Sequence, residues 1–115
     1  MDRIFQQTKG VQSFEERQAL SRLRQLLNES GFLQASLFRR RRPCGKSYCR
    51  CAVSKRHYHA SWYVGFSRKG RPQMKCIPEK WVEPVRLWIK RYREAGILLR
   101  SISRLYWKRL KSAKH

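Results

Sequence analysis

Cysteines and histidines gather in one short segment of this 115-residue chain. Cys44, Cys49 and Cys51 lie within eight residues, and His57 and His59 follow within the next eight. Thiolate and imidazole groups form the donor set of structural Zn²⁺ sites, which need four ligands in a tetrahedron. In the reducing compartment expected for this chain, cysteines are better suited to binding a metal than to forming disulfides. The segment therefore predicts a structural zinc site.

The spacing of these thiols, C-x4-C-x-C, differs from the paired C-x2-C knuckles of common zinc modules and leaves the fourth ligand open. His59, His57 and Cys76 are the candidates. Two interpretations compete with zinc. In one, the cysteines are reduced, buried and packed as small apolar residues. In the other, they have a redox role, because cationic neighbours lower thiol pKa values. An iron–sulfur cluster would require Cys76 as its fourth ligand.

The motif Cys44-Gly45-Lys46-x-x-Cys49-x-Cys51 precedes a histidine, an aromatic strand, a basic turn and a helix that begins at a proline. This arrangement resembles a family of small, functionally uncharacterised prokaryotic proteins, and the resemblance covers about Cys44 to Arg93. The family's His-Gly-Pro-Tyr-Tyr type stretch is matched by His59-Ala60-Ser61-Trp62-Tyr63, so Gly-Pro is replaced here. The resemblance implies His59 as the fourth ligand and carries no activity. The expected ligands of the zinc ion are Cys44, Cys49, Cys51 and His59.

Positive charge dominates the whole chain, with 28 lysines and arginines against 7 acidic residues and a formal net charge of +21. No acidic residue lies between Glu29 and Glu79 or after Glu94. A solvated surface ordinarily mixes both signs, so such blocks indicate an anionic partner. We expect nucleic acid, either structured RNA or duplex DNA, held through its phosphates. The expected contact residues are Arg39, Arg40, Arg41, Arg42, Lys46, Arg50, Lys55, Arg56, Arg68, Lys69, Arg71, Arg86, Lys90, Arg93, Arg100, Arg104, Lys108 and Lys111.

Aromatic residues are interleaved with the basic ones. Exposed aromatic rings stack on unpaired bases, but a hairpin of this size needs aromatic side chains to bury area. Core packing is therefore the expected role of Tyr48, Tyr58, Trp62, Tyr63 and Phe66. Trp107 is the best candidate for a contact with another molecule.

The sequence predicts both helices and strands as the elements that position these residues, so the expected fold class is α+β. After an N-terminal arm over residues 1–12, residues 13–115 are expected to form one domain. Ser13-Phe14-Glu15-Glu16 fits a capping box, in which the Ser13 hydroxyl accepts from the Glu16 amide and the Glu16 carboxylate reaches back. A helix is therefore expected from about Phe14 to Ser30, with Gly31 following its end.

A strand is expected over residues 32–38, leading into the arginines at 39–42. Residues 58–66 and 73–77, joined by a turn at 67–70, predict a β-hairpin. From Pro78 onward the pattern is helical, in one long helix or two nearly collinear ones. One stripe of this segment consists of the basic residues Arg86, Lys90, Arg93, Arg100, Arg104, Lys108 and Lys111. Its apolar stripe consists of Trp81, Val85, Trp88, Tyr92, Ala95, Leu99, Ile102, Tyr106 and Leu110.

Membrane and catalytic roles are not expected. No apolar run approaches the length of a transmembrane helix, and the first residues lack the apolar core of a signal peptide. No pair of acidic residues suggests a two-metal nuclease, and no glutamate accompanies the cysteines as a zinc deaminase requires. A catalytic pair formed by Cys51 and His57 is conceivable, but metal binding explains both residues with fewer assumptions.

We therefore expect a non-catalytic nucleic-acid-binding protein of the cytoplasm, associated with the nucleoid or with a ribonucleoprotein. It would be an accessory subunit of a larger nucleic-acid-processing assembly, stabilised by structural zinc. One alternative is a sequence-specific repressor or transposition accessory, which would act as a homodimer. Another is an adaptor that binds only an acidic protein.

Overall fold

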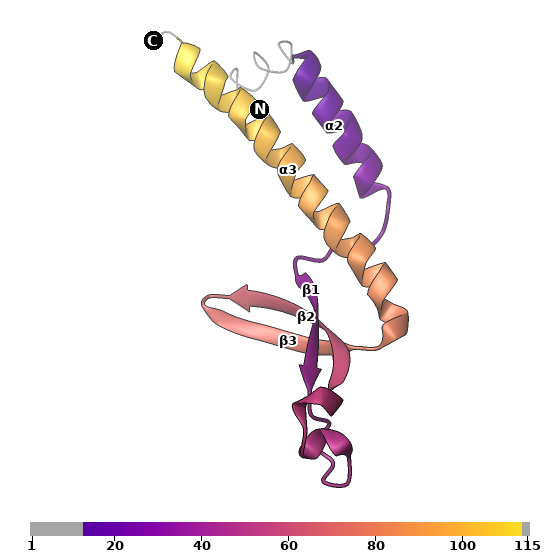
Figure 1. The fold of residues 1–115 in the computed structure, drawn as a ribbon. Coiled ribbons are helices and arrows are strands. Elements are labelled where there is room, and N and C mark those ends of the chain that lie inside the picture. Colours follow the sequence, from indigo (N-terminus) through magenta and orange to yellow (C-terminus); the bar gives the residue numbers. More distant parts are fainter. Residues whose placement is uncertain (1–12, 114–115) are drawn as a thin grey trace. The chain divides into compact units, whose positions relative to one another are not determined.

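The computed structural model describes residues 13–113, and its fold is α+β (Figure 1). Helix α2 (Phe14–Leu27) is followed by a three-stranded antiparallel sheet and by the long helix α3 (Val82–Ser112). The predicted fold class is confirmed, and α3 is a single helix of 31 residues that continues through Gly96. The N-terminal arm predicted over residues 1–12 lies outside the described residues.

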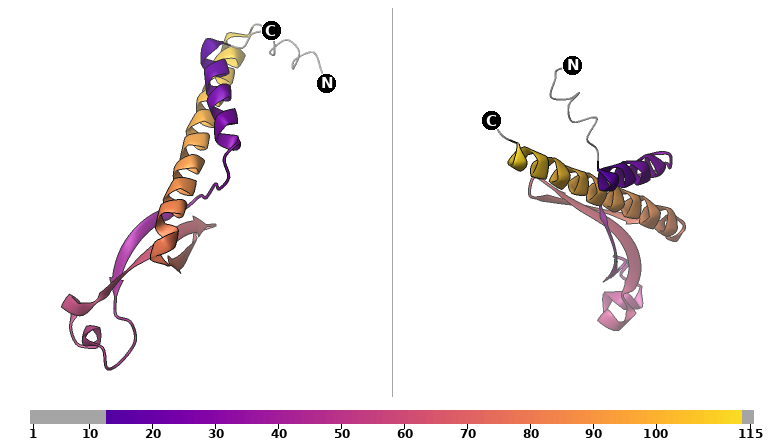
Figure 2. Two further views of the ribbon diagram at one scale, coloured as in Figure 1. Left: turned by 90° about the vertical axis from the view of Figure 1, so that its right-hand side faces the viewer. Right: turned by 90° about the horizontal axis from the view of Figure 1, so that it is seen from above.

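Residues 13–113 comprise two compact units. The helical unit consists of residues 13–30 and 91–113. The sheet unit consists of residues 31–90 and contains the strands, the cysteine-rich loop and the first turns of α3. Figure 2 shows the elements of both units from two further sides. Helix α3 thus contributes residues to each unit.

In the helical unit, α2 is joined to α3 through a buried glutamate. The Ser13 hydroxyl accepts a hydrogen bond from the Glu16 amide at 3.1 Å, as the capping box predicts. The second half of that prediction is wrong. The Glu16 carboxylate accepts a hydrogen bond from the Tyr106 hydroxyl at 2.8 Å and pairs with Arg109 at 2.6 Å. It turns to α3 because donors there satisfy both of its oxygens, and only 1% of Glu16 remains exposed.

Helix α2 ends at Leu27, earlier than the predicted end at Ser30. The amide of Asn28 already donates to carbonyl groups of the last turn, so Asn28 occupies the C-cap position. In the sheet unit, Gly31 has a φ of +94°, which residues with a side chain rarely adopt. Its backbone also lies against the indole of Trp88, where a Cβ atom would clash. Gly31 therefore does not cap α2; it allows the chain to turn three residues after the C-cap residue Asn28.

The sheet has the strand order β1-β2-β3, with β1 (Ser36–Arg42), β2 (His59–Arg68) and β3 (Arg71–Ile77). The predicted hairpin is confirmed as β2 and β3, with a turn at residues 69–70. Strand β1 starts four residues later than predicted and includes all four arginines. It extends through them because β2 pairs with every residue from Ser36 to Arg42.

The first turns of α3 supply the buried residues of the sheet unit. Pro78 precedes a 3₁₀ turn (Glu79–Trp81), after which Val82, Val85 and Ile89 are each almost completely buried. The amide of Leu33 donates to the carbonyl of Trp88, which joins the segment before β1 to this part of the helix. These contacts hold the sheet against the start of α3.

The apolar stripe predicted along α3 is only partly buried. Val85 is buried, and Trp88, Ala95, Ile102 and Tyr106 are half-buried. The prediction is wrong for the exposed members of the stripe, because the buried face of α3 changes along its length. These exposed members are Trp81, Tyr92, Leu99 and Leu110. Over residues 13–113, neither α2 nor α3 has the length and apolar character needed to span a bilayer.

Candidate metal centre

The cysteine-rich loop connects β1 to β2, and strand pairing brings its two ends together. Arg42, the last residue of β1, lies directly opposite His59, the first residue of β2. Cys44 is two residues beyond Arg42, so the register alone places it near His59. A 3₁₀ turn (Arg50–Ala52), which begins beside Cys49, bends the loop back and carries Cys51 inward. Only 2% of Cys51 is exposed.

Four of the side chains in this loop and at the start of β2 converge on one point. The ligand atoms of Cys44, Cys49, Cys51 and His59 all lie within 4.8 Å of one another. The Cys49 Sγ is 3.2 Å from the His59 Nε2, and the Cys44 and Cys51 Sγ atoms are 3.4 Å apart. All four cysteines of the chain are free thiols. The structure therefore brings together the ligand set that the sequence predicts.

The donor set and its spacing fit a tetrahedral metal ion. With metal–sulfur bonds of about 2.3 Å, ligand atoms in a tetrahedron are separated by roughly 3.8 Å. The observed separations of 3.2 and 3.4 Å are close to this value and would open slightly around an ion. The amide of Cys44 donates to the Cys51 Sγ at 3.2 Å, the kind of outer contact that supports a metal-bound thiolate.

Two of the thiols have shifted proton affinities. A backbone hydrogen bond from Lys46, and then the hydrogen bond with Cys51, lower the pKa of the Cys44 thiol. The Cys44 amide acts to lower the pKa of Cys51, but burial and the neighbouring thiols outweigh it, so that pKa is raised. Metal binding requires thiolates at both positions and would therefore release protons.

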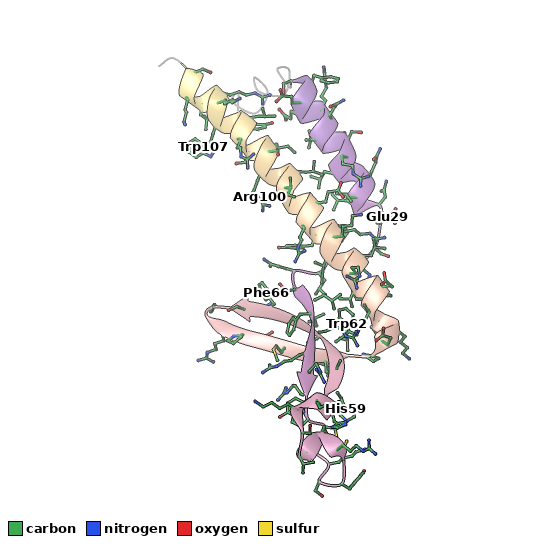
Figure 3. All side chains as sticks on the ribbon, in the orientation of Figure 1. Glu29, His59, Trp62, Phe66, Arg100 and Trp107 are labelled. Atoms are coloured by element: carbon green, nitrogen blue, oxygen red, sulfur yellow. The ribbon has the colours of Figure 1, made fainter. Side chains whose placement is uncertain are left out.

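The other candidates for the fourth ligand lie elsewhere. His57 belongs to a second 3₁₀ turn (Lys55–His57), and Cys76 lies in β3 opposite Tyr63. Neither belongs to the group of four, which is the group of potential metal ligands found among residues 13–113. His59 lies at the junction of the loop and the sheet (Figure 3).

An arginine from β1 supports the loop from the side. The Arg41 guanidinium donates to the carbonyl of Arg56 at 2.9 Å and approaches the carbonyls of Lys55 and Tyr58 at 3.4 and 3.5 Å. These carbonyls belong to the segment that returns from Cys51 to His59. This role of Arg41 is not predicted from the sequence, although alternation along a strand would separate Arg41 from Arg40 and Arg42.

Two other predicted contact residues also have partners within the protein. The Arg39 and Arg86 guanidinium carbons lie 5.2 and 5.6 Å from the centre of the Trp62 ring. Arg86 also pairs with Glu83 at 3.6 Å. Trp62 lies near the start of α3 (Figure 3). The packing role expected of Trp62 thus involves cation–π contacts on the helix side of the sheet.

The remaining predicted contact residues are exposed and fall on four parts of the fold. In the cysteine-rich loop they are Lys46, Arg50, Lys55 and Arg56. Around the hairpin turn they are Arg68, Lys69 and Arg71. On α3 they are Lys90 in the sheet unit and Arg93, Arg100, Arg104, Lys108 and Lys111 in the helical unit. Arg40 and Arg42 complete the set on β1.

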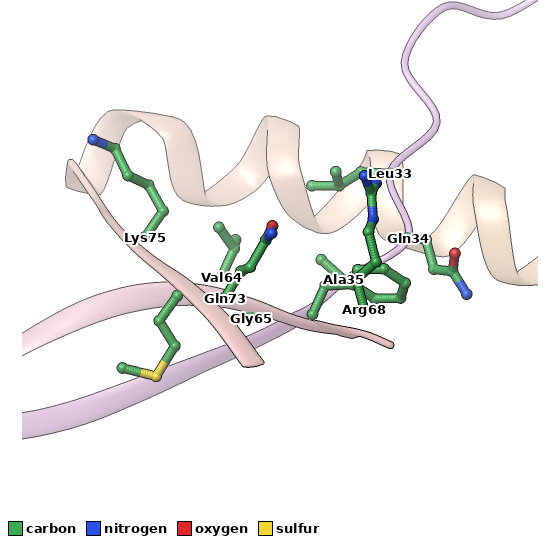
Figure 4. A pocket seen from close by; sticks show the side chains of 10 residues that line it. Leu33, Gln34, Ala35, Val64, Gly65, Arg68, Gln73 and Lys75 are labelled. Carbon is green, nitrogen blue, oxygen red and sulfur yellow. The ribbon is translucent and has the colours of Figure 1, made fainter. Parts of the chain in front are cut away.

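A separate pocket of about 320 Å³ lies beside the β2–β3 hairpin (Figure 4). Its lining includes Leu33, Ala35, Phe66, Gln73 and Lys75, and contains no cysteine, histidine or carboxylate. The pocket therefore offers apolar surface and basic groups at its edge, but no general base or metal ligand.

The model of a family described as Domain of unknown function (DUF6788) matches residues 15–87. This segment contains nearly all of α2, the whole sheet, the cysteine-rich loop and the start of α3. No curated protein and no solved structure matches the chain.

Proposed function

Because the chain belongs to the DUF6788 family, whose description assigns no activity, we propose from its own residues that it is a non-catalytic nucleic-acid-binding protein with a structural zinc ion. It grips the phosphate backbone through arginine and lysine side chains of the loop, the sheet and α3. It works in the cytoplasm, at the nucleoid or within a ribonucleoprotein. Zinc acts on the folding of the loop and takes no part in a reaction.

Zinc is the ion that best suits the four ligands. Three thiolates and one imidazole form a soft and borderline donor set, which favours Zn²⁺ over Mg²⁺ or Ca²⁺. Four protein ligands leave no open position for water or substrate, as expected of a structural site. An ion at this point would join both ends of the loop and fix the 3₁₀ turn between them.

The observation that carries the nucleic-acid proposal is the absence of acidic residues from the sheet and its loop. Every charged side chain from Gly31 to Pro78 is basic, so no carboxylate of this segment neutralises its arginines and lysines. The backbone of Arg42 pairs with His59 in the sheet, but its guanidinium makes no side-chain hydrogen bond or ion pair among residues 13–113. Such a surface attracts a polyanion and releases its counterions on binding.

An accessory role is supported by apolar surface on α3. In the helical unit, Ile97, Leu99 and Trp107 are more than half exposed, with 60% of Trp107 accessible. Scattered exposed apolar residues are normal, but several large ones on one helix suit contact with a larger protein. We propose that such a partner is part of a nucleic-acid-processing assembly.

The proposal is tested by measuring the affinity of the metal-loaded protein for fluorescent nucleic acid between about 50 and 200 mM salt. Six neutralised phosphates would lower the affinity roughly a thousandfold over this range. Arg40→Gln/Arg42→Gln should weaken binding and reduce the slope of log K against log salt by up to about 2. No binding of single strands, duplexes or folded RNA at low salt would overturn the proposal.

A matched control removes the same charge from another part of the chain. Arg17 and Arg24 are exposed residues of α2 that lie outside the predicted contact set. Arg17→Gln/Arg24→Gln should change the slope by less than half as much as the β1 variant. Equal effects would show that net charge alone governs binding.

A further inference from the structure

The open face of the sheet carries a distinct set of side chains. Alternation along β1 places Phe38, Arg40 and Arg42 on one face. Pairing places Tyr63 opposite Phe38, and Cys76 opposite Tyr63, on that same face. Met74, opposite Gly65, completes the set. We call Phe38, Tyr63, Met74, Arg40 and Arg42 the platform face.

The opposite face of the sheet contacts α3. Trp62 lies there beneath the guanidinium of Arg86, and the adjacent strand contributes Arg39 to the same ring. Arg41 points to the same face as Arg39 and donates a hydrogen bond to the cysteine-rich loop. On the platform face, 46% of Met74 is accessible, Arg40, Arg42 and Cys76 are exposed, and Phe38 and Tyr63 are half-buried.

Two aromatic rings form the centre of the platform face. The Phe38 and Tyr63 ring centroids are 5.9 Å apart, and the ring planes differ by only 15°. Gly65 leaves room for this arrangement, since a Cβ atom there would come within 3.1 Å of the Phe38 ring. Met74 is the third member, and polarizable thioethers pack well against aromatic groups. Phe38 and Met74 both border Gly65, where a Cβ atom would lie 3.1 and 3.7 Å from their side chains, so the rings and the thioether share the face away from Arg86.

Positive charge borders the patch along the same strand. Arg40 lies two residues beyond Phe38 and its Nη1 is 4.0 Å from the Met74 Sδ. Arg42 follows two residues later, about 7 Å further along the strand. A side-chain surface that combines aromatic rings with arginines matches both parts of a nucleotide, its base and its phosphate.

We propose that the platform face binds a single strand of nucleic acid, with unpaired bases stacked on Phe38 and Tyr63 and phosphates on Arg40 and Arg42. This inference rests on the proposed function and names its substrate class. Bases in a duplex are already stacked and paired, so their flat faces are closed to the platform. Stacking and phosphate contacts do not read the sugar, so single strands of DNA and RNA should bind equally well.

The deciding experiment compares two variants that add the same charge at adjacent positions. Met74→Glu places a carboxylate on the platform face, and Gln73→Glu places one on the opposite face of β3. Both positions are exposed, so both variants should fold. The probes are fluorescein-labelled oligo-dT and oligo-U of about ten nucleotides, and a blunt DNA duplex of about the same length.

We expect single strands to bind at least about tenfold more tightly than the duplex at equal salt. Met74→Glu should weaken single-strand binding at least about tenfold, in the range produced by loss of one stacked base, and Gln73→Glu no more than about threefold. Phe38→Leu should also weaken single-strand binding. Phe14→Leu, the same change at an exposed phenylalanine of α2, should not.

The outcomes separate this inference from the function on which it rests. If single strands and duplex bind equally well, and Met74→Glu and Gln73→Glu have equal effects, the platform face is not the site, but nucleic-acid binding stands. If no probe binds at low salt, the proposed function itself is wrong. If Phe38→Leu fails to fold, the comparison between Met74→Glu and Gln73→Glu still decides.

Discussion

Arg40 and Arg41 are adjacent in β1 and lie on opposite faces of the sheet with different partners. The Arg41 guanidinium donates to the Arg56 carbonyl at 2.9 Å, whereas the Arg40 guanidinium lies 4.0 Å from the Met74 thioether. One guanidinium therefore holds the cysteine-rich loop, and the other remains available at the surface. Alternation along a strand divides a run of four identical residues into two pairs with different roles.

The first prediction concerns these two pairs. Arg39→Gln/Arg41→Gln removes the contact with Trp62 and the hydrogen bonds to the loop, so it should lower the melting temperature by about 5 °C. Arg40→Gln/Arg42→Gln removes the same charge without those contacts and should leave the melting temperature within about 2 °C. Thermal unfolding followed by circular dichroism provides the measurement. Equal shifts for the two variants would contradict the division of roles.

The second prediction concerns the metal. In the zinc-loaded protein, only Cys76 should react quickly with a thiol reagent, because it lies outside the ligand group and is exposed. A chelator should raise the number of reactive thiols to all 4 cysteines and loosen the loop. Metal analysis of the same sample should find one zinc ion per chain.

The control for the thiol experiment is Cys76→Ser, which should abolish the fast reaction before chelation and leave three reactive thiols after it. Cys49→Ser should lose the metal. Fast reaction of all the thiols before chelation, or a metal content that Cys49→Ser does not change, would count against a zinc site.

The metal ligands could be predicted from the sequence because they are close together along the chain. Three of the four lie within eight residues, so chemistry and spacing suffice to group them. Choosing His59 over His57 depends on the register between β1 and β2, since pairing with Arg42 returns His59 to the start of the loop. A two-residue difference in sequence thus decides which imidazole reaches the thiols.

The contacts that the sequence could not predict join residues far apart along the chain. Glu16 fits a local capping box, but it is satisfied by Tyr106 and Arg109 instead. The predicted strand over residues 32–38 lies too early, because a run of arginines does not by itself indicate a strand and only pairing with β2 shows that these four belong to one. Local patterns predict such elements, and tertiary contacts then move their ends.

The third prediction concerns the buried carboxylate of the helical unit. Glu16→Gln removes the negative charge that pairs with Arg109 and should lower the melting temperature by roughly 5 to 10 °C. Glu15→Gln makes the same change at the exposed neighbouring residue and should have little effect on stability. Both variants raise the net charge by one unit, so a difference between their melting temperatures reflects the burial and pairing of Glu16. Similar melting temperatures would mean that the Glu16 ion pair contributes nothing to stability.

The fourth prediction concerns pH and the tyrosine that shares this carboxylate. The hydrogen bond with Glu16, followed by burial and the charge of Glu16, raises the pKa of Tyr106 above its usual value of about 10. The phenol therefore contributes stability that is fully present below pH 10 or so and is lost as the pH rises through the pKa of the folded state. Tyr106→Phe should be less stable than the parent protein by about 1 to 2 kcal/mol near pH 8.

That difference should shrink as the pH approaches 11, because the parent protein loses the contribution of the phenol and the variant has none to lose. Chemical unfolding at a series of pH values measures it, provided that ionic strength is held constant. Tyr92→Phe is the matched control, since Tyr92 is an exposed tyrosine of the same helix. A difference between Tyr106→Phe and the parent protein that stays constant from pH 8 to pH 11 would show that the bond to Glu16 does not depend on the phenolic proton.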